Sequence, residues 1–135
     1  MRSLWRHTIL AAAGALALAA ATAAAGAQAA PAAAAEPDST AITPAMVDAG
    51  RAVFRGKGTC FACHGMMLEG TQVAPTLKAH AWKDAKNGDL KNIFAVITHG
   101  VPSTVMVAFP GGITKADATN VASYVWSVGR GKAKP

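Results

Sequence analysis

The sequence contains little cysteine, few aromatic side chains and little negative charge. Among 135 residues there are 2 cysteines, 6% aromatic residues and 7 acidic against 13 basic residues, for a formal net charge of +6. No internal repeat or alternating strand pattern is visible, and no long block of one charge suggests a nucleic-acid partner. A chain of this length allows one modest domain, which excludes a large multidomain enzyme.

Charged residues are also missing between Thr8 and Ala35, where alanine predominates. A positively charged start, Met1–His7, precedes this apolar run, and small residues follow it, ending in Ala27-Gln28-Ala29. A signal peptidase accepts this pattern, so residues 1–29 are predicted to be a signal peptide and the remainder an exported, periplasmic protein. An uncleaved membrane anchor is the alternative, because about 20 apolar residues span a bilayer. Neither cysteine lies in this leader, which excludes a lipid anchor there.

The rest of the chain divides by composition into a linker, one domain and a short tail. Residues 30–41 are rich in alanine and proline with nothing bulky to bury, so we expect a flexible linker. The folded domain is predicted over residues 42–130. Residues 131–135 are polar and contain glycine and proline, which is typical of a tail.

Three short helices are predicted from capping residues and apolar spacing, so the domain is expected to be all-α. The first follows Thr43 as N-cap, the second begins at Asp89, and the third begins with a capping box of Thr114 and Asp117. Glycines after the first two helices, among them Gly100, are expected to end them. The apolar faces of the three helices are Val47, Gly50, Val53 and Phe54; Leu90, Ile93, Phe94 and Ile97; and Ala118, Val121, Val125 and Val128.

The connections between these helices are long for so small a domain, which indicates a function or a missing structural element. The first of them contains Cys60-Phe61-Ala62-Cys63-His64, a C-x-x-C-H pattern that is a signal for covalent haem attachment. On one helical turn, positions i, i+3 and i+4 share a face. Cys60 and Cys63 can then bond the two vinyl groups of one haem while His64 ligates the iron.

Three other interpretations of this pattern use the same residues. A disulfide between Cys60 and Cys63 would close a very short ring and leave His64 without a role. A thioredoxin-like redox pair would need a βαβ pattern, which is absent here. A zinc site would need further ligands, usually a second Cys or His pair. Haem attachment is therefore the main prediction.

With these residues the sequence resembles the class I c-type cytochromes from about Thr43 to Val128. The resemblance rests on Gly50 and Phe54, the C-x-x-C-H pentapeptide, the loop Ala74-Pro75-Thr76-Leu77, the segment Gly100–Phe109 and Tyr124. It implies a small helical domain around one covalent haem c, whose first and last helices cross. It also implies that Gly50 allows the two helices to approach closely and that Phe54 and Tyr124 pack where they cross.

Met106 is predicted to be the sixth ligand of the iron, opposite His64. It lies in a loop between two predicted helices, whereas Met66 and Met67 are too close to His64 and Met46 belongs to the first helix. A thioether favours ferrous iron, and His/Met ligation leaves no open site for oxygen chemistry. Two histidines, His80 and His99, remain rival ligands, and an ordinary core role for Met106 is the other alternative.

Two further site residues follow only from the resemblance. It implies that the carbonyl of Pro75 accepts a hydrogen bond from the Nδ1 atom of His64, and that the indole of Trp82 donates to a haem propionate. Where many relatives have Met-Pro, this chain has Met106-Val107, so the local loop differs from the common pattern.

Taken together, the sequence predicts a periplasmic monohaem cytochrome that passes single electrons between redox partners and is not itself an enzyme. A dedicated cytochrome subunit of a periplasmic dehydrogenase or oxidase complex is one alternative, and an open-site haem enzyme or gas sensor is another. A third alternative is a zinc or dithiol module. Four lysines between the Pro75 loop and the second helix would favour an acidic partner, or would simply keep the domain soluble: Lys78, Lys83, Lys86 and Lys91.

Overall fold

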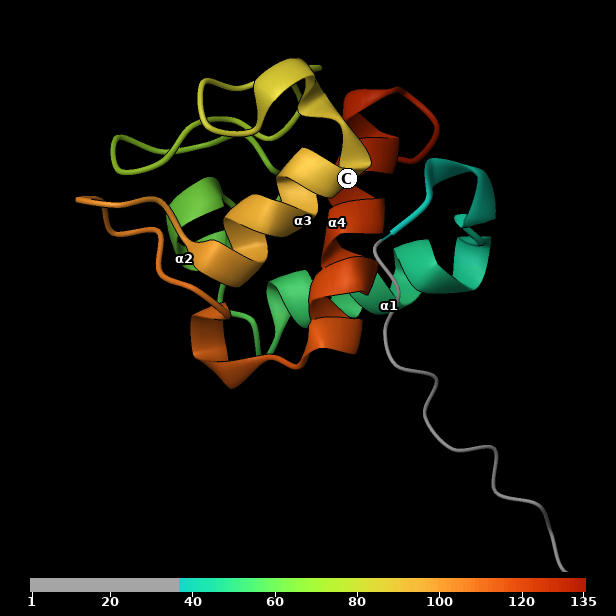
Figure 1. Cartoon of the computed structure of the whole chain (residues 1–135), viewed down its shortest axis with the longest axis horizontal. Helices are drawn as coiled ribbons and strands as arrows, with labels where there is room; N and C mark the ends of the chain where they lie inside the picture. Colours follow the sequence, from blue (N-terminus) through green and yellow to red (C-terminus); the bar gives the residue numbers. More distant parts are fainter. Residues whose placement is uncertain (1–36) are drawn as a thin grey trace, which may run out of the picture. The chain divides into compact units, whose positions relative to one another are not determined.

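The computed structural model describes residues 37–135, and the expected signal peptide and most of the expected linker lie outside this range. The described part contains four α-helices and three short 3-10 helices and no strand, as expected for an all-α domain (Figure 1). In chain order the elements are η1 (Ser39–Ala41), α1 (Pro44–Arg55), α2 (Phe61–His64), η2 (Lys86–Gly88), α3 (Leu90–His99), η3 (Pro110–Gly112) and α4 (Lys115–Gly129). No helix within residues 37–135 has the length and apolar character needed to cross a membrane.

The helix starts predicted from capping residues are confirmed. Thr43 is the N-cap of α1, and its hydroxyl accepts a hydrogen bond from the Met46 amide at 3.2 Å. The first turn of α4 carries a complete capping box, in which the Thr114 hydroxyl accepts from the Asp117 amide at 3.2 Å and the Asp117 carboxylate accepts from the Thr114 amide at 2.9 Å. Asp89 is the N-cap residue of α3, but its side chain makes no capping hydrogen bond.

An ion pair ties the start of α4 to the loop between α1 and α2. Lys57 Nζ lies 2.7 Å from the Asp117 carboxylate. The hydrogen bonds from Lys57 and Thr114 lower the pKa of Asp117 to about 2, because both stabilise its charged form. The cap of α4 therefore also fixes the loop that leads into the C-x-x-C-H pentapeptide.

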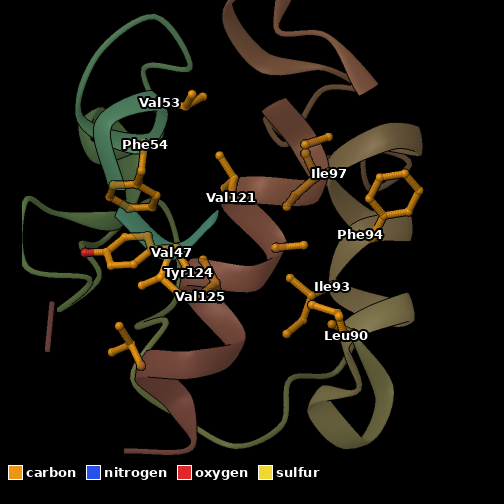
Figure 2. Packing of buried hydrophobic residues seen from close by; sticks show 14 of the residues in the cluster. Val47, Val53, Phe54, Leu90, Ile93, Phe94, Ile97, Val121, Tyr124 and Val125 are labelled. Atoms are coloured by element: carbon orange, nitrogen blue, oxygen red, sulfur yellow. The ribbon is translucent and has the colours of Figure 1, made fainter. Parts of the chain in front are cut away.

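The first and last long helices, α1 and α4, form the most extensive packing between elements (Figures 1 and 2). A Cβ atom placed on Gly50 would overlap the Asn120 carbonyl oxygen and lie 2.9 Å from Tyr124 Cβ, so only glycine allows this approach. Next to this contact Phe54 and Tyr124 are fully buried, with ring centroids 5.7 Å apart and an interplanar angle of 72°. This edge-to-face geometry is favourable for aromatic pairs, and the packing confirms the crossing that the resemblance implied.

Helix α3 packs against a second face of α4 (Figure 2). The apolar faces predicted for α3 and α4 are the ones that are buried, and they join α1 in one cluster. The labelled members in Figure 2 are Val47, Val53, Phe54, Leu90, Ile93, Phe94, Ile97, Val121, Tyr124 and Val125. These three helices form the rigid frame to which the long connections are attached.

The segments expected to flank the domain take part in its structure. Residues 39–41 of the expected linker form η1, whose N-cap Asp38 accepts a hydrogen bond from the Thr40 amide. At the other end, the Lys132 amide donates to the Ser127 carbonyl at 2.8 Å, and the Arg51 guanidinium donates to the Lys134 carbonyl at 3.0 Å. The packed structure therefore continues beyond the expected boundary at residue 130, because backbone groups of the tail find partners on α1 and α4.

Candidate haem-binding site

One cavity of about 340 Å³ lies between the helical frame and the long connections. Its inner wall is formed by apolar side chains of α3 and α4, including Ile93, Ile97, Val121 and Val125 (Figure 2). Its outer wall is formed by the connections between helices. All six predicted site residues line this cavity: Cys60, Cys63, His64, Pro75, Trp82 and Met106.

The C-x-x-C-H pentapeptide forms one helical turn. Cys60 is the helical N-cap residue of α2, and its carbonyl accepts from the Cys63 amide at 3.3 Å and from the His64 amide at 3.0 Å. The turn ends at Gly65, which has a φ of 79°. This geometry places Cys60, Cys63 and His64 on the same side of the turn, and all three line the cavity.

Both cysteines are free thiols in the structure. Burial raises the pKa of Cys60 to about 11, and the neighbouring Cys63 acts in the same direction. A raised pKa disfavours the thiolate that a catalytic dithiol needs. Within residues 37–135 no group of three or more His, Cys, Asp or Glu side chains is arranged to hold a metal ion.

The imidazole of His64 is held from the side of its Nδ1 atom. Nδ1 lies 2.9 Å from the Pro75 carbonyl oxygen, the contact that the resemblance implied. If Nδ1 carries the proton, it donates to this carbonyl and leaves Nε2 as the unprotonated nitrogen. Burial lowers the pKa of His64, and the Pro75 carbonyl opposes this shift. The result is a neutral imidazole suited to ligate a metal.

The loop that carries Pro75 is fastened to the same turn by hydrogen bonds to two carbonyls of the turn. The Gly70 amide donates to the His64 carbonyl at 2.7 Å, and the Thr71 hydroxyl donates to the Cys63 carbonyl at 2.7 Å. Further along, the Leu77 amide donates to the Leu68 carbonyl at 2.8 Å, and the Leu68 side chain is fully buried. The carbonyl that orients His64 is therefore held by the structure around it.

Trp82 lines the cavity, but its indole N–H has a partner other than the one expected. It donates to the Thr76 carbonyl at 2.6 Å, within the loop that carries Pro75. The resemblance had implied donation to a haem propionate. The hydrogen bond to Thr76 ties the indole to this loop, and donation to a haem propionate stays a prediction.

Met106 is partly buried and lines the cavity, in the loop that connects α3 and α4 (Figure 1). Its amide donates to the Thr104 hydroxyl oxygen at 3.1 Å, and its carbonyl accepts from the Val101 amide at 2.8 Å. The rival His99 does not line the cavity, because its Nδ1 atom lies 2.9 Å from the Ala95 carbonyl at the end of α3. His80 is exposed and also lies outside the cavity lining.

The sequence analysis did not identify the apolar rim of the cavity. Val73, Val105 and Val107 line it, and 62%, 64% and 59% of their surfaces are exposed. These residues belong to irregular loops, so no helical or strand period distinguishes them in the sequence. Apolar groups that remain exposed around a cavity mark a binding surface rather than a core.

The residues present fit a covalently attached haem c. Two thiols on one helical turn, an oriented imidazole with Nε2 available and a thioether all line one apolar cavity. The dithiol and zinc alternatives find no support in the thiol of Cys60 or in the surrounding ligands.

Comparison with known proteins supports the same interpretation. Residues 45–125 match the family model described as cytochrome C oxidase, cbb3-type, subunit III. No curated protein matches the chain significantly. Among solved structures, cytochrome cL from Methylophaga aminisulfidivorans MPT has 27% identity and a TM-score of 0.54, over 62% of this chain and 53% of that one.

Two further structures are similar to this chain. Cytochrome c6 from the diatom Phaeodactylum tricornutum has 27% identity and a TM-score of 0.53, over 64% of this chain and 98% of that one. Cytochrome cL from Hyphomicrobium denitrificans shares the fold, with 22% identity and a TM-score of 0.51. The match covers 59% of this chain and 45% of that one. The chain thus spans about half the length of the two cytochromes cL. It belongs to the family of cytochrome c oxidase, cbb3-type, subunit III, and its domain is a class I c-type cytochrome that binds haem c.

Proposed function

We propose that this protein is an exported monohaem electron carrier with one His/Met-ligated haem c. The observation that carries the proposal is the single cavity lined by Cys60, Cys63, His64 and Met106, with the imidazole already oriented by a carbonyl. Cys60 and Cys63 tether the cofactor by thioether bonds. His64 and Met106 would ligate the iron.

The haem supplies the redox chemistry, a change of one electron between ferric and ferrous iron. The residues of the chain that hold the iron govern this change of oxidation state. The Pro75 carbonyl, 2.9 Å from Nδ1, would hold the His64 ring in one orientation during this change. The thioether of Met106, as a ligand of the iron, would favour the ferrous state and would leave no open site for oxygen or peroxide.

The environment of the cavity suits electron transfer rather than catalysis. Its lining is mostly apolar, and the only charged side chain among the lining residues is Asp84. An apolar wall excludes water and favours the less charged state of the cofactor, which supports a raised reduction potential.

An acidic redox protein is the partner that the surface charge favours. Lys78, Lys83, Lys86 and Lys91 are all exposed, and without Arg2 and Arg6 of the leader the chain has 11 basic against 7 acidic residues, a net charge of +4. A positive surface speeds encounter with a negative one, and salt screens this attraction. The second-order rate of electron transfer should fall as ionic strength rises, and a rate independent of salt would contradict the proposed partner chemistry.

A permanent place in an enzyme complex is the second candidate function. It is favoured by the family itself, which is described as a subunit of a cytochrome c oxidase. Copurification of the protein with a membrane oxidase or a dehydrogenase at high salt would favour the subunit. A free monomer that exchanges electrons in salt-sensitive bimolecular collisions would favour the carrier.

The leader makes the periplasm the proposed compartment, with a signal peptide over residues 1–29. Mass spectrometry of the exported protein tests this, because cleavage after Ala29 fixes the mass of the product. A product that keeps the leader and remains with the membrane fraction would instead establish an anchor.

The test of the site combines a denaturing gel stained for haem with visible spectra of both oxidation states. The protein should retain haem through denaturation, and the ferric form should show a weak far-red charge-transfer band from sulfur to iron. Met106→Ala should lose the band and bind carbon monoxide in the reduced form. The matched control is Met66→Ala, because Met66 is 50% exposed and does not line the cavity.

The outcomes of this test separate the alternatives. A band that persists in Met106→Ala would exclude Met106 as ligand. Carbon monoxide binding to the unaltered reduced protein would favour an open-site haem enzyme or gas sensor. A colourless protein with free thiols would refute the haem site altogether.

A further inference from the structure

Gly100 lies where α3 ends and the loop that carries Met106 begins (Figure 1). Its φ of 70° and ψ of −171° belong to a region that is essentially restricted to glycine. Its amide donates to the Val96 carbonyl at 2.9 Å, which closes the last turn of the helix. The chain therefore changes direction at this residue, and a side chain would strain the backbone there.

The space beside Gly100 is occupied by the backbone of the Met106 loop. A Cβ atom at Gly100 would lie 2.6 Å from the Met106 carbonyl oxygen, 2.9 Å from the Ala108 amide nitrogen and 3.0 Å from the Val107 carbonyl carbon. All three atoms belong to backbone, so none can move away by a change of rotamer. A side chain at this position would push the loop away from the end of α3.

Two hydrogen bonds hold the loop against this point. The Val101 amide donates to the Met106 carbonyl at 2.8 Å, and the Phe109 amide donates to the Ile97 carbonyl at 2.8 Å. The first joins the residue after Gly100 to Met106 itself. The second returns the chain to α3, whose Ile97 side chain lines the cavity. These two hydrogen bonds hold the loop against the C-terminal end of α3, where its backbone lies beside Gly100.

We infer that Gly100 is a positioning residue for the axial ligand: the absence of a side chain lets the backbone of residues 106–108 lie against the end of α3, and this places Met106 at the iron. The inference rests on the proposed function, in which Met106 is the sixth ligand. It assigns to Gly100 a role in ligation, beyond that of ending a helix.

The test is Gly100→Ala in the holoprotein, with the far-red sulfur-to-iron band as readout. The strained backbone and the displaced loop should shift the ratio of Met-bound to Met-free iron toward the free form by about tenfold or more. The band should weaken accordingly, the reduced protein should bind carbon monoxide, and the reduction potential should fall. Helix content from far-UV circular dichroism and covalent haem on a gel should be retained.

Gly112→Ala is the matched control. Gly112 also has a positive φ, 73°, and lies in the same connection between α3 and α4, but a Cβ atom there would meet nothing within 4 Å. It therefore tests a positive φ without crowding of the loop. The control should keep the band and should not bind carbon monoxide. Equal loss of the band in both variants would overturn the specific role of Gly100.

Comparison with Met106→Ala distinguishes failure of this inference from failure of the proposed function. If Met106→Ala keeps the band, then His/Met ligation is wrong. If Met106→Ala loses the band while Gly100→Ala keeps it with an unchanged potential, then only the inference about Gly100 is wrong.

Amide hydrogen exchange on the unaltered holoprotein tests the inference even if Gly100→Ala fails to mature. The amides of Val101 and Phe109 should exchange much more slowly than amides of exposed loops, because both donate within the closed loop. Rapid exchange at both positions would show that the loop is not held at the helix end, and would overturn the inference.

Discussion

Replacement of Gly50 by alanine sets two known effects against each other at the contact between α1 and α4. In the interior of a helix, alanine is more favourable than glycine by about 1 kcal/mol. Against this, the new Cβ atom would overlap the Asn120 carbonyl oxygen and lie 2.6 Å from the Asn120 carbonyl carbon and 2.9 Å from Tyr124 Cβ. The sign of the change in stability therefore reports which effect is larger.

The structure indicates that the steric effect is larger. Carbon atoms pack at about 3.5–4.0 Å, so the contact with Tyr124 alone requires the helices to separate by roughly 0.6–1.1 Å. Overpacking of a core typically costs about 1–3 kcal/mol, and the upper end applies here because the obstructing atoms belong to the backbone of α4. After the helix propensity is subtracted, Gly50→Ala should destabilise the domain by about 2 kcal/mol.

The assay is urea unfolding of the holoprotein, followed by far-UV circular dichroism. The midpoint should fall with little change in the slope. Ala52→Gly is the control on the same helix, because Ala52 is exposed and its replacement measures the propensity effect alone, a loss of about 1 kcal/mol. A Gly50→Ala protein as stable as the unaltered protein, or more stable, would refute the close approach of α1 and α4.

Four further predictions concern the cap of α4, the Trp82 loop and the cofactor. Thr114→Ala should cost about 1 kcal/mol in urea unfolding, since it removes one half of the capping box. The pKa of Asp117 is lowered from 3.8 to about 2, so the charged carboxylate contributes its full stabilisation above pH 4 and loses it as the pH falls through 2. Asp117→Asn should therefore flatten the plot of unfolding free energy against pH between these values. An unchanged plot would exclude the ion pair with Lys57. Trp82→Phe keeps an aromatic ring but removes the N–H that donates to the Thr76 carbonyl. It should lower the free energy of unfolding by about 1 kcal/mol and keep the far-red band. Loss of that band would show a direct role at the iron. The doubly substituted Cys60→Ala, Cys63→Ala chain, made without haem, should lack a cooperative unfolding transition, and a cooperative one would show that the helices suffice alone.

The helices were predictable from the sequence because their signals are local. Thr43 and Thr114 each cap the backbone amide three residues away, and the burial of α1, α3 and α4 follows the apolar period of each segment. The C-x-x-C-H turn is equally local, since its spacing alone places three side chains on one face. Such features need no knowledge of the rest of the chain.

The parts that the sequence did not indicate depend on distant partners. Trp82 donates to a carbonyl in its own loop, a choice that depends on how residues 75–82 fold. Residues 131–135 are polar, yet they pack because Arg51 and Ser127 offer them hydrogen bonds. The rim valines and the crowding at Gly100 likewise follow from the path of a loop, and loops carry no period to interpret.

The pairing of α1 with α4 has a consequence for the order of events during synthesis and export. The buried face of α1 is completed by the last helix of the chain, so a nascent chain that has not yet reached Gly129 has no partner for that face. The two cysteines, which lie between these helices in the sequence, emerge long before the fold can close. Attachment of the cofactor can therefore precede folding, and the closing of α4 onto α1 would then enclose a haem that is already bound to the chain.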